Sequence, residues 1–166
     1  MLGIGYPGGP EVDRLAKQGN SRAVDFPRPY LDGNSFEFSF SGIKTSVLYY
    51  LRKKGFDRAK ADESFVADVC ASFQAAVVDV LVQKLIQAAT KYAVRDIAVA
   101  GGVAANSELR RRLKEETDTR SLGVFIPKFE YCTDNGAMVA MAGYLKMKEG
   151  KTTNLEVTAE PNLMLS

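Results

Sequence analysis

The chain has 166 residues, of which 46% are hydrophobic and 25% are charged, values typical of a globular domain with one buried core. The 22 Lys and Arg residues are nearly balanced by 20 Asp and Glu residues, and a net charge of +2 is too small for a protein that binds nucleic acid through charge alone. The sequence contains no histidine, which excludes histidine-based acid–base chemistry from this chain alone.

The cysteines and the apolar runs indicate the cellular compartment of the protein. Cys70 and Cys132 lie far apart in the sequence, which predicts free thiols in a reducing compartment. No apolar run approaches the roughly 20 residues that cross a bilayer, and the N-terminus lacks the features of a signal peptide. We therefore expect a soluble, cytoplasmic protein with no membrane partner.

The first predicted element is a short helix after the turn sequence Tyr6-Pro7-Gly8-Gly9-Pro10. Its apolar residues share one face at helical spacing, and Gly19 is placed to end it as a glycine C-cap. Residues 20–35 carry prolines and glycines in polar sequence and predict a loop.

A strand and two helices are predicted next. Phe36-Glu37-Phe38-Ser39-Phe40 alternates aromatic and polar residues, as in a half-buried strand. Apolar residues at helical spacing then predict a helix over 43–53, ended by Gly55. The clearest feature is a broad apolar face that predicts a long helix from about Asp62 to Tyr92.

The last third predicts strands alternating with helices. Residues 97–100 read as a buried strand, followed by a glycine turn and a helix, and residues 124–126 read as a second strand. A final helix over 137–148 should be capped by Thr133 or Asp134 and should end at Gly150. We expect a helix-rich α/β fold with two or three strands and a long central helix, in one segment over 1–150 with a tail over 151–166.

One candidate site is the connection Gly101-Gly102-Val103-Ala104-Ala105-Asn106. After a strand and before a helix, backbone amides and the helix dipole favour an anion such as phosphate. The simpler alternatives are a plain glycine turn and an N-cap role for Asn106.

A second candidate is the segment Tyr131-Cys132-Thr133-Asp134-Asn135-Gly136. Asp134 is either a helix cap, the simpler reading, or a hard-oxygen metal ligand. Cys132 has no paired base and reads as a structural thiol. The run Arg110-Arg111-Arg112 is most simply a solvated helix face, and alternatively a contact for RNA phosphates.

Four segments together resemble one family closely: Gly5-Tyr6-Pro7-Gly8-Gly9-Pro10, Ser39-Phe40-Ser41-Gly42-Ile43-Lys44-Thr45, Ala100-Gly101-Gly102-Val103-Ala104-Ala105-Asn106 and Cys132-Thr133-Asp134-Asn135-Gly136. This is the TsaD family, also called Gcp or YgjD and formerly labelled O-sialoglycoprotein endopeptidase or glycoprotease. The motifs follow in the family's order over nearly the whole chain, so the match is highly specific.

The resemblance implies an ASKHA fold, related to actin and the sugar kinases, and a transferase that works with TsaB and TsaE-like proteins. The family moves threonylcarbamoyl from threonylcarbamoyl-AMP to the N6 amine of the tRNA adenosine next to the anticodon. By motif position, Gly9, Asp13 and Asn106 correspond to residues that contact the adenylate or ATP. Gly101 and Gly102 correspond to residues along its phosphates.

By the same resemblance, Asp134 corresponds to a carboxylate ligand of a divalent metal, iron or zinc in the family. The family's metal is held chiefly by two histidines of an HxxxH motif in an N-terminal half, and this chain has no histidine. The chain therefore resembles only the C-terminal half, with the N-terminal half expected as a partner.

Three functions follow from this reading. The first is the C-terminal portion of the transferase, inactive by itself. The second is a stand-alone nucleotide-binding or partner-docking module without catalysis. The third, the metallopeptidase of the older family label, is disfavoured because the chain has neither histidine nor an HExxH helix.

Overall fold

The computed structural model describes residues 1–29, 35–158 and 160, and packing divides the chain into two units, Met1–Cys132 and Thr133–Ser166. Residues 30–34 of the predicted loop, and residues 159 and 161–166 of the predicted tail, lie outside the described residues. The predicted division at residue 150 stays a prediction.

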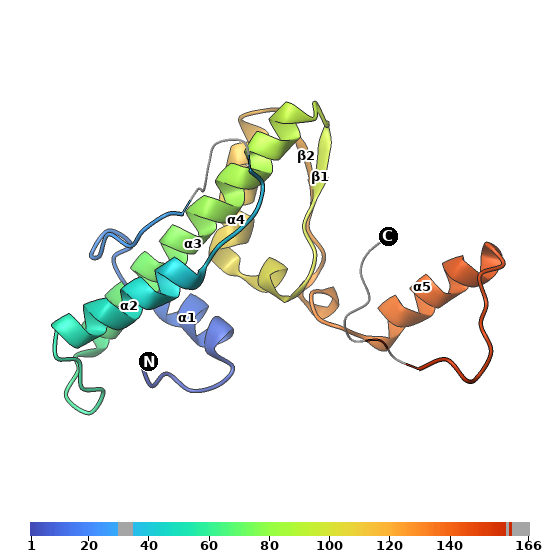
Figure 1. The fold of residues 1–166 in the computed structure, drawn as a ribbon. Helices are drawn as coiled ribbons and strands as arrows, with labels where there is room; N and C mark the ends of the chain where they lie inside the picture. The colour runs from blue at the N-terminus through green and yellow to red at the C-terminus, as the bar shows by residue number, and fades with distance from the viewer. Residues whose placement is uncertain (30–34, 159, 161–166) are drawn as a thin grey trace. The chain divides into compact units, whose positions relative to one another are not determined.

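Helix α3, Glu63–Lys91, runs the length of the first unit (Figure 1). Its bounds match the predicted long helix within one residue, and the Asp62 side chain caps it by accepting a hydrogen bond from the Ser64 N–H. Three further helices pack on it: α1 (Gly8–Ala16), α2 (Ser41–Lys53) and α4 (Ser107–Asp118). Because neighbours surround α3, its buried residues lie on several sides rather than on one face.

The apolar character of α3 follows from this burial. By length and composition it is apolar enough to cross a membrane, so the expectation that no run reaches that length is wrong. In its most apolar stretch, 61% of the residues are buried inside the fold. A mostly buried core helix passes the same test.

Two glycines end or border helices in different ways. After α2, Gly55 has a φ of +60°, and the Phe56 N–H donates to the Leu51 carbonyl at 3.0 Å, a glycine C-cap as predicted. Gly19 does not end α1 in this way, which corrects the prediction. Its role is close approach, since a Cβ there would lie 2.1 Å from the Ala67 carbonyl oxygen of α3.

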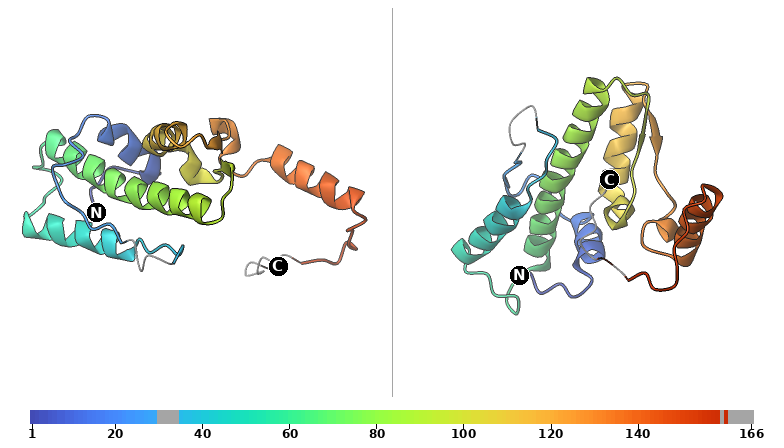
Figure 2. Two further views of the ribbon diagram at one scale, coloured as in Figure 1. Left: turned by 90° about the horizontal axis from the view of Figure 1, so that it is seen from above. Right: turned by 45° about the vertical axis from the view of Figure 1, so that its right-hand side comes forward.

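The sheet has two parallel strands, β1 (Asp96–Ala98) and β2 (Gly123–Phe125), paired with Ile97 opposite Val124. Helix α4 connects them, and the second view of Figure 2 shows it beside the strands. A short 3₁₀ helix, η1 (Gly102–Ala105), follows β1, and another, η2 (Phe129–Tyr131), follows β2. The helix-rich α/β class and the two strands of this region are confirmed.

The predicted strand Phe36–Phe40 is wrong. These residues are irregular and pair with no strand among the described residues. The Phe36 ring instead lies 5.8 Å from the Tyr92 ring, and the Lys91 ammonium lies 5.0 Å from the Phe36 centroid. Alternation alone does not make a strand, because a strand needs a hydrogen-bonding neighbour.

The second unit contains helix α5, Gly136–Lys148. Asn135 caps it, with its Oδ1 accepting the Met138 N–H at 2.9 Å, so the prediction of Thr133 or Asp134 as the cap is wrong by one or two residues. Gly150, with a φ of +73°, ends the helix region as predicted. No residue of α5, all of which the structure describes, is buried.

Candidate functional site

A cavity of about 570 Å³ lies in the first unit, where the start of α1 faces the connection between β1 and α4. Four of the five residues predicted for the nucleotide line it, namely Gly9, Asp13, Gly102 and Asn106. Gly101 adjoins Gly102 in the chain and is not among the lining residues. The remaining lining residues are Pro10, Arg14, Lys17, Val103, Ala105 and Phe129.

A hydrogen bond joins the two sides of this cavity. The Asn106 Nδ2 donates to Asp13 Oδ1 at 3.2 Å, across 93 positions of sequence. The Ser107 hydroxyl donates to the same carboxylate oxygen at 2.8 Å. These contacts fix α1 against the start of α4 and hold the Asp13 carboxylate at the cavity wall.

Gln74 of α3 completes the arrangement and was missed by the sequence reading. Its Oε1 accepts the second Nδ2 hydrogen bond of Asn106 at 2.8 Å, and its side chain is buried. Asn106 Oδ1 accepts the Leu109 N–H at 2.9 Å, so the cap reading of Asn106 is confirmed. Both amide hydrogens and the amide oxygen of Asn106 therefore have protein partners. No signal in the sequence distinguishes Gln74 from the other polar residues of this helix, such as Asp68 and Ser72.

The N-terminus of α4 already holds a negative charge. The Ser107 N–H lies 3.3 Å from each Asp13 carboxylate oxygen, and the Leu109 N–H is taken by Asn106. A carboxylate at this end interacts favourably with the helix dipole. The sequence predicted an anion at the start of this helix, and the Asp13 carboxylate occupies part of that position.

The glycines of the β1–α4 connection shape the cavity wall. Gly101 has φ +85° and ψ 173°, a conformation open essentially to glycine. A Cβ on Gly9 or on Gly102 would meet no protein atom within 4 Å. A ligand can therefore approach the backbone closely at both positions. The contact of Gly101 and Gly102 with nucleotide phosphates, and that of Gly9 with the adenylate, stay predictions.

Two cations also border the cavity, Arg14 from α1 and Lys17 from the C-cap of this helix. Lys17 Nζ lies 3.8 Å from Asp13 Oδ2, and Arg14 lies 2.9 Å from Glu11. Each is exposed on at least half of its side chain. A ligand anion can therefore replace the acidic partner of either cation at a small cost in free energy.

The predicted solvated face of three arginines holds for Arg111 only, which pairs with acids of its own helix. Arg112 is partly buried and lies 2.9 Å from Asp79 of α3. Arg110 donates to the Ala104 and Pro127 carbonyls, each at 2.6 Å. It also donates to the Sγ of Cys132, which is 2% exposed, in agreement with a structural thiol.

Asp134 lies in the second unit, in the segment that leads to α5. It is exposed, and no hydrogen bond or ion pair of its side chain is found in the described part of the chain. Among the described residues, no group of three or more His, Cys, Asp and Glu side chains is arranged to hold a metal ion.

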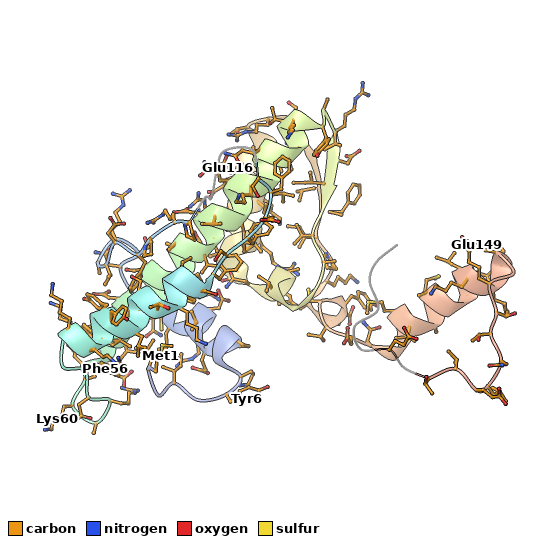
Figure 3. All side chains as sticks on the ribbon, viewed as in Figure 1. Met1, Tyr6, Phe56, Lys60, Glu116 and Glu149 are labelled. Atoms are coloured by element: carbon orange, nitrogen blue, oxygen red, sulfur yellow. The ribbon has the colours of Figure 1, made fainter. Side chains whose placement is uncertain are left out.

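A larger cavity of about 690 Å³ lies between the first residues of the chain, α2 and α3. Both cavities have mostly apolar linings, but among the described residues Lys44 is the one charged side chain that lines the larger cavity, which contains none of the predicted site residues. Near it, Tyr6 projects from the segment before α1 and is 97% exposed (Figure 3). The polar groups that suit a nucleotide lie instead in the smaller cavity.

Comparison with known proteins identifies similar chains. A family model described as "TsaD: tRNA N6-adenosine threonylcarbamoyltransferase" matches residues 1–141. Three similar proteins are named tRNA N6-adenosine threonylcarbamoyltransferase. The one from Thermosipho africanus is 47% identical over 99% of this chain and 48% of its own length. The one from Clostridium botulinum (strain Kyoto / Type A2) is 49% identical over 99% of this chain and 47% of its own length. The one from Moorella thermoacetica is 49% identical over 100% of this chain and 48% of its own length. The chain spans about half the length of the curated relatives it matches.

Proposed function

The chain belongs to the TsaD family, and we propose that it forms the C-terminal, nucleotide-binding portion of a tRNA N6-adenosine threonylcarbamoyltransferase. As such a portion it contributes part of an ASKHA fold, with the N-terminal half, TsaB and TsaE-like proteins and tRNA as its partners in the cytoplasm. It binds the adenylate of threonylcarbamoyl-AMP or ATP, and transfer itself requires the other half.

The observation that carries the proposal is the cavity between α1 and the β1–α4 connection. Gly9 and Asp13 come from one end of the chain, and Gly102 and Asn106 come from its second half, yet all four line this one cavity. A cavity with two glycine walls, one carboxylate and two cations matches the parts of a nucleotide. Glycines admit phosphate oxygens, and a carboxylate accepts hydrogen bonds from ribose hydroxyls.

The chemistry of the family's reaction gives each group a task. The N6 nitrogen forms a bond to the carbamoyl carbon, the bond from that carbon to the AMP oxygen breaks, and N6 loses one proton. AMP leaves with an additional negative charge on its phosphate. We assign to Arg14 and Lys17 the stabilisation of that phosphate, and to Asp13 the orientation of the ribose.

The metal of the family does not fit the described residues of this chain. Asp134 offers one exposed carboxylate, the sequence has no histidine, and no cluster of three donors exists among the described residues. A stable divalent site needs more protein ligands than one carboxylate. We therefore assign no step of this chain to a metal.

Calorimetric titration of the purified chain with ATP tests the proposal, with Gly9→Leu and Gly42→Leu as a matched pair. Each glycine is the second residue of its helix, and a Cβ on either meets no protein atom within 4 Å. Only Gly9 lines the cavity. We expect saturable binding that Gly9→Leu abolishes and Gly42→Leu preserves.

Two outcomes would contradict the proposal. Absence of ATP binding by the unmodified chain would remove the nucleotide from this portion of the enzyme. Equal binding by the Gly9→Leu and Gly42→Leu variants would move the nucleotide to another surface.

A further inference from the structure

We propose that Phe129 is the platform on which the purine ring of the bound nucleotide stacks, and that Arg110 is the positioning residue that holds this ring in place. The inference rests on the proposed nucleotide site and adds the residue that recognises the base. Neither residue belongs to the motifs from which the site was predicted.

Phe129 is an aromatic side chain left open to a ligand. It is 63% exposed, although it lines the same cavity as Gly102 and Asn106. It begins η2, the short turn that follows β2 and Pro127. The other lining residues are two glycines, one carboxylate, one amide, two cations and the aliphatic Pro10, Val103 and Ala105, so Phe129 supplies the one aromatic surface of this cavity among the described residues.

Arg110 covers one face of the Phe129 ring, with its guanidinium carbon 4.2 Å from the ring centroid. A cation at this distance is attracted to the π face. The guanidinium is itself fixed, because it donates to the carbonyls of Ala104 in η1 and Pro127 after β2. Arg110 thereby links the glycine connection to the aromatic ring and has its donors directed at protein acceptors.

This arrangement suits a flat, weakly polar ring more than a peptide or an aliphatic group. Bases stack on an exposed aromatic face without requiring particular hydrogen bonds, and an arginine on the far face adds to the attraction. Asp13 and Phe129 line one cavity, which provides a carboxylate for the sugar and a platform for the base of the same nucleotide.

Tryptophan fluorescence tests the platform directly, because the chain contains no tryptophan. Phe129→Trp introduces one fluorophore at the proposed platform. Tyr131→Trp is the matched control, since Tyr131 is a 51% exposed aromatic residue of the same η2 turn and does not line the cavity. We expect ATP to quench the emission of the first variant and not that of the second. Tripolyphosphate, which lacks the base, should quench neither.

Affinity gives a second readout. Phe129→Leu should raise the Kd for ATP about tenfold, as expected for loss of base stacking, and leave the Kd for tripolyphosphate unchanged. Arg110→Lys retains the cation and loses the planar fork, so it should raise the Kd for ATP by a smaller factor, again without a change for tripolyphosphate. A merely structural role of Arg110 would weaken both ligands together.

The outcomes separate this inference from the proposed function. ATP binding by calorimetry without quenching in Phe129→Trp would overturn the platform and leave the nucleotide site in place. Equal quenching in Phe129→Trp and Tyr131→Trp would also overturn it. No ATP binding by the unmodified chain would overturn the platform and the nucleotide site together.

Discussion

Replacing Asn106 by alanine should cost the first unit about 1.5–5 kcal/mol of its free energy of unfolding. The Asn106 oxygen caps α4, and loss of such a cap costs about 0.5–2 kcal/mol. Its amide nitrogen donates to Asp13 and Gln74, and two such hydrogen bonds contribute about 1–3 kcal/mol together. This is a large share of the roughly 5–15 kcal/mol that stabilises a domain.

Asn106→Ser separates the two contributions. Serine caps a helix about as well as asparagine, but it has no amide to donate to both Asp13 and Gln74. The serine variant should therefore lose only the part that comes from the two donated bonds, and the further loss in the alanine variant measures the cap.

Urea unfolding followed by circular dichroism measures all three proteins. With a slope of about 2 kcal/mol per M, the alanine variant should unfold at about 0.75–2.5 M less urea than the unmodified chain, and the serine variant should fall between them. A midpoint of Asn106→Ser equal to that of the unmodified chain would refute the role given to the amide. A loss below about 0.5 kcal/mol in Asn106→Ala would refute the whole arrangement.

Three further predictions concern packing and the thiols. Gly19→Ala should lower the midpoint of urea unfolding, because its Cβ would lie 2.1 Å from the Ala67 carbonyl oxygen. Gly42→Ala is the control and should have little effect, because its Cβ meets no atom within 4 Å. Equal midpoints of the two variants would refute the close approach of Gly19 to α3. Burial raises the pKa of Cys70 to about 11 from its ordinary 9.0, so the unfolded chain loses this proton first as the pH rises. The free energy of unfolding should then fall between about pH 9 and 11, by up to roughly 1.4 kcal/mol per pH unit, and the same fall in Cys70→Ala would refute this cause. Because Cys70 and Cys132 are both buried, a thiol reagent should label neither in the native chain and both in urea, and rapid native labelling would contradict their burial.

Features that depend on neighbouring residues were readable from the sequence. The bounds of α3, the Gly55 end of α2 and the Asn106 cap of α4 all follow from side chains and amides within about one helical turn. The order of β1, α4 and β2 was likewise set by apolar runs and the turns between them. These signals are local because the hydrogen bonds that they describe are local.

Features that depend on contacts between residues far apart in the sequence were decided only by the tertiary structure. The alternation of 36–40 predicted a strand, but no strand pairs with it in the described chain, and Phe36 lies instead against Tyr92, the C-cap residue of α3. Resemblance named Asp13 and Asn106 separately, and only the fold shows that they bond to each other and that Gln74 holds the amide from 32 residues away. Arg110 likewise read as one charge of a solvated run until packing placed it against Phe129. Contacts across such separations depend on how whole helices pack, which no window of a few residues records.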